Sequence, residues 1–266
     1  MKSVEIENTN IMVSRLGFGT ASLHHLFNSR ERQALLQAAA DSGISHFDTS
    51  PYYGYGLAEQ DLGRFLKRRR QAFTLTTKIG LYPWGRPSRT VAGVWGRIAL
   101  GKLVSRVSLP VASWAINHAQ ASLGASLKRL GTDYVDFLLL HEPIASLINT
   151  DEFLTWLQAE QTRGRIRAWG IAGLAEHLRP FVQQGNPLAT VVQTKDSLSQ
   201  QQAAFMADAQ RNLQFTYGYL SSASTQGTLV DPRAILKQAL VRNQTGALLV
   251  STRRVNHLQS LAEVAH

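Results

Sequence analysis

Short apolar runs alternate along the chain with segments in which apolar residues recur every three or four positions. The runs lie at residues 16–18, 46–47, 73–76, 134–140, 166–171, 190–192, 213–215 and 247–250. Strands that alternate with helical segments are typical of a parallel sheet with crossover helices. Eight strands favour a closed (β/α)8 barrel, the TIM-barrel fold, over an open doubly wound sheet. We therefore predict an α/β protein with a single domain over residues 1–266.

The predicted helices have recognisable ends. Asn28, with Glu31 three residues later, predicts the N-cap of a helix that runs to Gly43. Gly131 predicts the end of another helix, and we expect Thr150 to cap a third. The apolar faces are Leu62, Phe65 and Leu66; Ile116, Leu123, Leu127 and Leu130; Phe153, Leu154 and Leu157; and Val255, Leu258 and Leu261.

The length and composition suit one barrel. The chain has 266 residues, of which 44% are hydrophobic and 17% charged, so it can bury a sizeable core. No apolar run approaches the roughly 18 residues of a membrane span, and no secretory leader pattern is present, so we expect a cytoplasmic enzyme. The chain has no cysteine, which excludes disulfides and thiolate chemistry.

The net charge of +10 raises the question of nucleic-acid binding. The densest basic run, residues 67–70, lies where a helix is expected to end, and cations there complement the helix dipole. We therefore interpret it as a solvated helix end. The overall charge is expected to attract small anions such as a dinucleotide phosphate, and no nucleic-acid partner is predicted.

Two stretches lack a clear period, residues 82–113 and residues 218–230. Both follow predicted strands, the third and the seventh. The loops that follow the strands of a barrel form its active face. We interpret both stretches as substrate or cofactor loops, with a plain surface insertion as the alternative for 82–113.

Polar residues stand at the ends of four predicted strands: Asp48, Lys78, His141 and Gln193. In a barrel, these four side chains would meet at one mouth. A single charge after a buried run is more readily explained as an ion pair at the rim, because unpaired burial is costly. Four together indicate a site.

Tyr53 lies five residues after Asp48 and could act as a proton donor. A tyrosine ordinarily ionises near pH ~10, and a neighbouring ammonium lowers that pKa. We expect Lys78, kept charged by Asp48, to lower the pKa of Tyr53, and His141 to hold the substrate oxygen. This arrangement suits carbonyl reduction, in which hydride reaches carbon while Tyr53 protonates oxygen.

The motifs that contain these residues resemble those of the aldo-keto reductase family. Residues 46–54, His-Phe-Asp-Thr-Ser-Pro-Tyr-Tyr-Gly, are similar to its aspartate–tyrosine signature, and Glu59 and Gly63 follow. Thr77-Lys78 matches its lysine motif, and residues 125–136 match a third motif before the strand that ends on His141. The resemblance implies a (β/α)8 barrel with a catalytic tetrad of Asp48, Tyr53, Lys78 and His141.

No Gly-x-Gly-x-x-Gly motif opens a βαβ unit, so a dinucleotide would not bind in the Rossmann mode. The resemblance implies another mode, an extended NADP(H) across the barrel mouth. Gly19 and Thr20 would approach the nicotinamide ribose, and Gln193 would hold the carboxamide beside Asp48. Tyr217 would stack on the ring. Leu220 and Ser222 would lie along the pyrophosphate.

The chain departs from the family pattern at two places. The family usually has Ser-Asn after the fifth strand, both contacting the carboxamide, where this chain has Ala172 and Gly173. In the adenosine-phosphate motif, Ser251 replaces a lysine and His257 an arginine, while Thr252 keeps the hydroxyl. Arg253 and Arg254 could restore the charge, so we predict NADP rather than NAD.

The predicted function is an NADP(H)-dependent reductase or dehydrogenase acting on an aldehyde, ketone or sugar. The alternative is a nucleotide-binding barrel with weak turnover, acting as a redox sensor or regulatory subunit. The eight histidines show no metal-ligand spacing, so no metal is expected. The oligomeric state is left open. Candidate substrate walls are Phe27, Tyr55, Trp84 and Trp114.

Overall fold

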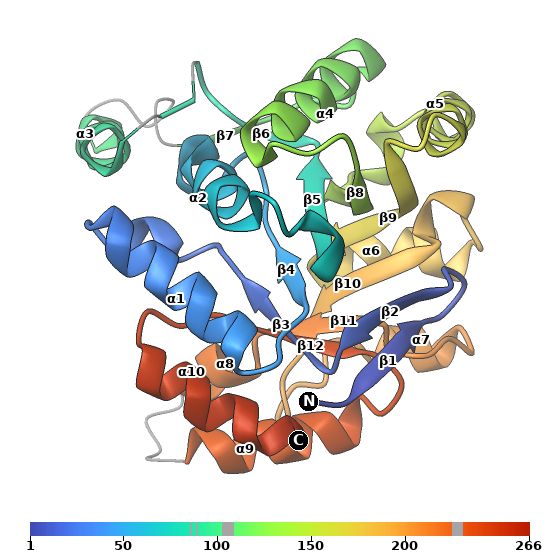
Figure 1. Ribbon diagram of the computed structural model, residues 1–266. Coiled ribbons are helices and arrows are strands. Elements are labelled where there is room, and N and C mark those ends of the chain that lie inside the picture. Colours follow the sequence, from blue (N-terminus) through green and yellow to red (C-terminus); the bar gives the residue numbers. More distant parts are fainter. Residues whose placement is uncertain (86, 89, 103–108, 225–230) are drawn as a thin grey trace.

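Eight parallel strands close into a barrel in a computed structural model that describes residues 1–85, 87–88, 90–102, 109–224 and 231–266 (Figure 1). Each strand pairs with the next barrel strand along the chain, and the last pairs with the first. The strands are β3 (Leu16–Gly19), β4 (His46–Asp48), β5 (Thr74–Ile79), β8 (Val135–His141), β9 (Ile166–Gly173), β10 (Val191–Lys195), β11 (Phe215–Tyr217) and β12 (Ala247–Val250). The predicted (β/α)8 fold is confirmed.

Most strand boundaries differ from the predicted runs by one to three residues, and the seventh and third strands illustrate the reason. The seventh strand was expected at 213–215, but its pairing with β10 begins at Phe215 and continues to Tyr217. Lys78, expected at the end of its strand, is followed by one more strand residue, Ile79. In both cases the strand continues past its predicted end because backbone pairing, and not hydrophobicity, sets where a strand ends.

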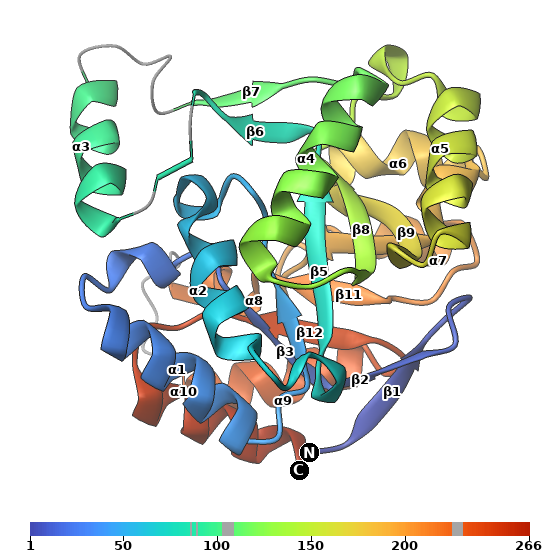
Figure 2. The same ribbon diagram turned by 45° about the horizontal axis from the view of Figure 1, so that its top comes forward.

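Helices surround the barrel (Figures 1 and 2). They are α1 (Ser29–Asp41), α2 (Leu57–Leu66), α3 (Val91–Gly101), α4 (Ile116–Leu130), α5 (Thr150–Thr162), α6 (Ala175–Gln183), α7 (Ala204–Asp208), α8 (Tyr219–Ser224), α9 (Pro232–Arg242) and α10 (Val255–Ala262). Asn28 caps α1 as predicted, and Gly131 ends α4 at φ 63°. The expected cap of α5 was wrong. Asn149 accepts the hydrogen bond from the Glu152 N–H, while Thr150 is the first helical residue and bonds Asn186 instead.

An N-terminal hairpin that the sequence analysis did not predict closes one end of the barrel. It consists of β1 (Ser3–Ile6) and β2 (Ile11–Ser14). Ile6, Ile11 and Val13 are buried and join the apolar cluster inside the barrel, which includes Phe137 and Phe215. The hairpin therefore plugs the amino-terminal end of the strands, and the opposite end is left for a site.

The stretch 82–113 contains regular structure. Strands β6 (Leu81–Pro83) and β7 (Pro110–Ala112) pair as an antiparallel hairpin, and α3 lies between them along the chain (Figure 2). Residues 86, 89 and 103–108 of this predicted loop lie outside the described residues. In the second predicted loop, α8 covers 219–224, and residues 225–230 lie outside the described residues.

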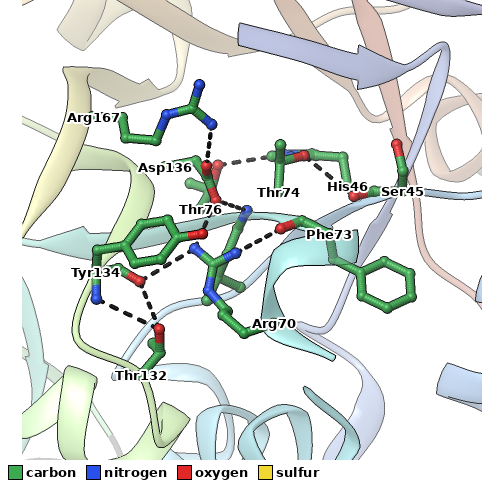
Figure 3. A network of polar contacts seen from close by, with 11 residues as sticks. Ser45, His46, Arg70, Phe73, Thr74, Thr76, Thr132, Tyr134, Asp136 and Arg167 are labelled. Atoms are coloured by element: carbon green, nitrogen blue, oxygen red, sulfur yellow. Dashed lines mark hydrogen bonds and ion pairs between the residues drawn. The ribbon is translucent and has the colours of Figure 1, made fainter. Parts of the chain in front are cut away.

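A buried polar network ties together the amino-terminal ends of β4, β5, β8 and β9 (Figure 3). The Asp136 carboxylate pairs with Arg70 and Arg167, at 2.7 Å each, and accepts the Leu75 N–H. Arg70 belongs to the basic run 67–70, and Arg69 covers the Phe65 ring at 3.9 Å. The prediction of a solvated helix end therefore holds for the exposed residues 67 and 68 only. Residues 69 and 70 stabilise the fold.

Candidate active site

The four predicted tetrad residues meet in one pocket at the carboxyl ends of the barrel strands. The cavity has a volume of about 130 Å³. Its lining residues are Gly19, Ala21, Asp48, Tyr53, Lys78, His141, Ala172, Gly173, Gln193, Tyr217, Leu249, Val250 and Ser251. Residues separated by up to 232 positions in the sequence thus face one cavity, because the parallel strands all end on the same side.

Lys78 and Asp48 form a buried ion pair at the base of the pocket. The Lys78 ammonium lies 2.6 and 2.7 Å from the two Asp48 carboxylate oxygens and donates to the Thr49 carbonyl at 3.0 Å. Lys78 is only 1% exposed. The alternation of β5 explains its direction: Lys78 points into the barrel, while the neighbouring Thr77 hydroxyl points outward to Glu59. Such a pair survives burial because its partners neutralise each other.

Tyr53 lies over this pair at the start of a short 3-10 turn, Tyr53–Gly56. The turn takes left-handed dihedral angles at Gly54, Tyr55 and Gly56, and Tyr55 does so at φ 52° without being glycine. Strained backbone of this kind clusters at functional sites. The Tyr53 ring centroid is 5.0 Å from the Lys78 ammonium and 6.0 Å from the His141 ring, edge to face.

The expected lowering of the Tyr53 pKa is wrong for this structure. Burial raises the pKa of Tyr53 well above its ordinary value, and the Asp48 and Glu142 carboxylates raise that pKa further. The ammonium of Lys78 is already matched by Asp48, so it does not offset the desolvation of a phenolate. Tyr53 is therefore a neutral phenol at neutral pH, the form that can donate a proton.

His141 is also neutral. Burial, followed by the charge of Lys78, lowers the pKa of His141 to about 3. Its Nδ1 lies 3.5 Å from the Ser50 hydroxyl. Burial likewise lowers the pKa of Lys78, against the opposing effect of Asp48. A neutral imidazole and a neutral phenol that share a pocket offer two hydrogen bonds to one substrate oxygen.

Most of the predicted cofactor residues line one of three neighbouring hollows. Gly19, Gln193, Tyr217 and Ser251 line the tetrad pocket. Leu220 lines a second hollow beside Tyr217, and Thr252, Arg253, Arg254 and His257 line a third with Ser22 and His25. Ser251 contributes to all three, so the hollows follow one another around residue 251. This arrangement fits an extended dinucleotide.

Two predicted cofactor residues line none of these hollows. Thr20 is fully buried, and its hydroxyl donates to the Asp48 carbonyl, so it joins β3 to β4. Ser222 lies in α8. The four suggested substrate-wall residues are also absent from the pocket lining. Trp114, for instance, packs its ring against Gly80, and Phe27 stacks on Trp95.

Gln193 carries a buried polar atom that the protein leaves unpartnered. Its amide nitrogen donates to Asp48 at 3.0 Å, and its buried Oε1 has no hydrogen-bond partner among the described residues. Buried acceptors without partners are rare and call for an explanation. A donor on a bound ligand, such as the amide of a nicotinamide ring, would satisfy this oxygen. The residues present therefore fit a nicotinamide cofactor.

Sequence reasoning missed Glu142. This residue directly follows His141, and its carboxylate contacts the Leu174 N–H and the His177 ring beside the pocket. The sequence does show an acid next to the predicted tetrad histidine. Its direction depends on a positive φ of 51° that the sequence pattern does not reveal.

A closed (β/α)8 barrel with an aspartate, lysine, tyrosine and histidine at its carboxyl mouth defines a class of barrel enzymes, and comparison with known proteins names the family. A sequence model described as "Aldo/keto reductase family" matches residues 15–265. The chain belongs to the aldo/keto reductase family.

Individual relatives agree with this assignment. D-threo-aldose 1-dehydrogenase of Pseudomonas sp is 30% identical over 206 residues, which are 73% of this chain and 60% of that protein. NADH-specific methylglyoxal reductase of Escherichia coli (strain K12) is 30% identical over 74% of this chain and 60% of that protein. The chain thus spans about 60% of the length of these curated relatives.

A solved aldo-keto reductase from Klebsiella pneumoniae, in complex with NADPH, is similar in fold. The TM-score is 0.69 at 18% identity, over 99% of this chain and 89% of that one. In the described part of this chain, no helix is long and apolar enough to cross a membrane. The same residues contain no group of three or more His, Asp or Glu side chains that could hold a metal ion.

Proposed function

We propose that this protein is an NADP(H)-dependent oxidoreductase that transfers hydride between nicotinamide and an aldehyde, ketone or sugar carbonyl. The observation that supports this most is the neutral Tyr53 phenol above the buried Lys78–Asp48 pair in a pocket with an unpartnered Gln193 oxygen. When bound, the reduced nicotinamide supplies the hydride. A carbonyl substrate suits a site that offers neutral hydrogen-bond donors rather than a nucleophile.

Each residue of the tetrad has a distinct part in this proposal. Tyr53 donates its phenolic proton to the oxygen that becomes the alcohol, and in the reverse direction it accepts that proton. The Lys78 ammonium, 5.0 Å from the ring centroid, faces the negative charge that develops on Tyr53 as the proton leaves, although burial outweighs its effect on the resting phenol. Asp48 keeps Lys78 charged and in place. His141 holds the substrate oxygen with a neutral imidazole.

Substitution of Tyr53 tests the role of the proton donor. We expect Tyr53→Phe to bind NADPH as wild type does and to lose most turnover, about 100-fold to 10,000-fold, as is usual for loss of a general acid. Tyr82→Phe is the matched control, because Tyr82 is a buried tyrosine that does not line this pocket. Full activity in Tyr53→Phe would exclude the proposed donor.

The preference for NADP over NAD rests on the third hollow. Arg253 and Arg254 lie there with Thr252 at the start of α10, where helix geometry and guanidinium groups both suit a phosphate. Arg253→Ala combined with Arg254→Ala should weaken NADPH binding by about tenfold or more and leave NADH binding unchanged. Exposed Arg179→Ala is the control. Equal losses for both cofactors would contradict a 2′-phosphate contact.

The relatives support a small carbonyl substrate. One acts, by its name, on a D-threo-aldose and the other on methylglyoxal. A panel of aldoses and short aldehydes, followed through the absorbance of NADPH, tests this class. The alternative, a nucleotide-binding barrel with regulatory function, predicts tight NADPH binding by wild type with no turnover across that panel. Measurable turnover that depends on Tyr53 would reject it.

A further inference from the structure

Glu142 occupies the space that a side chain at position 173 would need. A Cβ placed on Gly173 would lie 2.3 Å from Glu142 Oε2 and 3.1 Å from Oε1. No real Cβ sits that close to a heavy atom. Gly173 lines the tetrad pocket, and its strand neighbour Ala172 pairs in register with Gln193. The Glu142 carboxylate therefore occupies the side-chain space beside Gly173, a residue of the pocket lining.

The backbone and two hydrogen bonds fix this position. Glu142 leaves β8 at φ 51°, and its N–H donates to the Ala172 carbonyl at 2.7 Å, so the side chain crosses to the end of β9. Oε2 accepts the Leu174 N–H at 3.0 Å and the His177 Nδ1–H at 2.7 Å. Both of these bonds go to one oxygen, and within the described part of the chain Oε1 has no recorded hydrogen bond.

The charge of Glu142 reaches the centre of the pocket. Tyr217 and Tyr53 both line the cavity. After burial, the Glu142 carboxylate is the largest cause that raises the pKa of Tyr217, and it also raises the pKa of Tyr53. Tyr217 is the residue expected to stack on the nicotinamide ring. A negative group that acts on both tyrosines also acts on a ring placed between them.

We propose that Glu142 positions the nicotinamide end of the cofactor and stabilises its oxidised, cationic ring relative to the reduced, neutral ring. This proposal rests on the proposed function. Oε1 accepts a hydrogen bond from a donor on the ring, while the carboxylate charge attracts the ring cation. Tighter binding of the oxidised form shifts the bound couple toward hydride donation, so the site favours carbonyl reduction.

The test measures binding rather than turnover. NADP⁺ and NADPH are titrated separately into wild type, Glu142→Gln and Glu176→Gln, with tryptophan fluorescence or calorimetry as the readout. Glu142→Gln keeps the shape and an acceptor but removes the charge. We expect it to weaken NADP⁺ binding about tenfold more than NADPH binding. Glu176 is exposed in the first turn of α6, so Glu176→Gln removes the same charge from a nearby position. This control should leave the ratio of NADP⁺ affinity to NADPH affinity unchanged.

A swap separates the hydrogen bond from the charge. Glu142→Ala vacates the space, and Gly173→Asn fills it with a neutral amide. The double variant should recover most of the NADPH affinity that Glu142→Ala loses. Its ratio of NADP⁺ affinity to NADPH affinity should stay at the value of Glu142→Gln. Gly173→Asn alone collides with the carboxylate and should destabilise the protein. The effects of the two substitutions on NADPH affinity should not add, because the two side chains occupy the same space.

Three results would overturn the inference. If Glu142→Gln keeps the wild-type ratio and only lowers the melting temperature, Glu142 serves the end of α6 and nothing else. If the double variant binds NADPH no better than Glu142→Ala, the carboxylate makes no ring contact. If wild type binds neither nucleotide, the proposed function fails and the inference with it. Binding by wild type with an unchanged ratio in Glu142→Gln rejects the inference alone.

Discussion

His46 should make the stability of this barrel fall in mild acid. It is fully buried at the start of β4 and contacts the rings of Phe137 and Phe215. Its ring nitrogens lie beside the hydroxyls of Thr74 and Thr76 (Figure 3). Burial lowers the pKa of His46 to about 3, against a smaller opposing effect of the Asp136 carboxylate. In the unfolded chain the pKa returns to its ordinary value of 6.5.

The sign and size follow from proton linkage. Between pH 6.5 and about 3, His46 binds a proton in the unfolded chain but stays neutral in the folded protein. The free energy of unfolding therefore falls as the pH falls through this range. The contribution of His46 is fully present above pH 6.5. One titrating group changes the free energy by about 1.36 kcal/mol per pH unit, so the loss by pH ~5 is about 2 kcal/mol.

The assay is urea unfolding at pH ~7.5 and pH ~5 for wild type and His46→Gln. Glutamine keeps a polar contact but does not titrate. The variant is less stable at the higher pH, and its loss on acidification should be smaller than that of wild type by about 2 kcal/mol. Exposed His118→Gln is the control and should follow wild type. Parallel losses in His46→Gln and wild type would refute the reasoning.

Other perturbations test the packing and the polar contacts. Gly63→Ala should lower the free energy of unfolding in urea by more than about 2 kcal/mol, because its Cβ would lie 2.4 Å from a backbone oxygen. A Cβ at Gly96 meets nothing within 4 Å, so Gly96→Ala should raise the free energy of unfolding by about 0.5–1 kcal/mol. Asp136→Asn removes the charge of a buried carboxylate that pairs with Arg70 and with the exposed Arg167, and it should lower the free energy of unfolding by about 3–5 kcal/mol in the same measurement. Glu263→Gln, in an exposed pair, should cost less than about 1 kcal/mol. Asn149→Ala should lower the melting temperature through loss of a cap worth about 1 kcal/mol.

The sequence predicted the barrel because each buried strand leaves a local apolar run and about half of the helices leave a recognisable cap or periodic face; α6 and α9 were not predicted. These signals depend on residues close together in the chain, which is why α4 was placed between Ile116 and Gly131. The amino-terminal hairpin was missed for the opposite reason. Its apolar residues Ile6, Ile11 and Val13 are few, and their burial depends on contact with a barrel interior built by distant strands.

The site was predictable in its residues and not in its electrostatics. Parallel strands must end on one side, so Asp48, Lys78 and His141 could be brought together from the sequence. The raised pKa of Tyr53 could not be predicted from the sequence, because this pKa depends on how completely the pocket excludes water and on the carboxylate of Glu142. Desolvation and through-space charge are set by packing in three dimensions, and no linear spacing encodes them.

The two ends of the barrel show how structure distinguishes a stabilising polar cluster from a functional one. At the amino-terminal end, both oxygens of Asp136 have close partners. At the carboxyl end, Lys78 and Asp48 are equally well paired, but Gln193 buries an oxygen that no described residue satisfies. Burying an acceptor without a partner lowers stability, so a fold selected only for stability would fill or pair this position. Buried atoms without a partner also occur elsewhere among the described residues, and Arg70 Nε of the amino-terminal cluster is one of them. The Gln193 oxygen points to a ligand because Gln193 also lines the tetrad pocket.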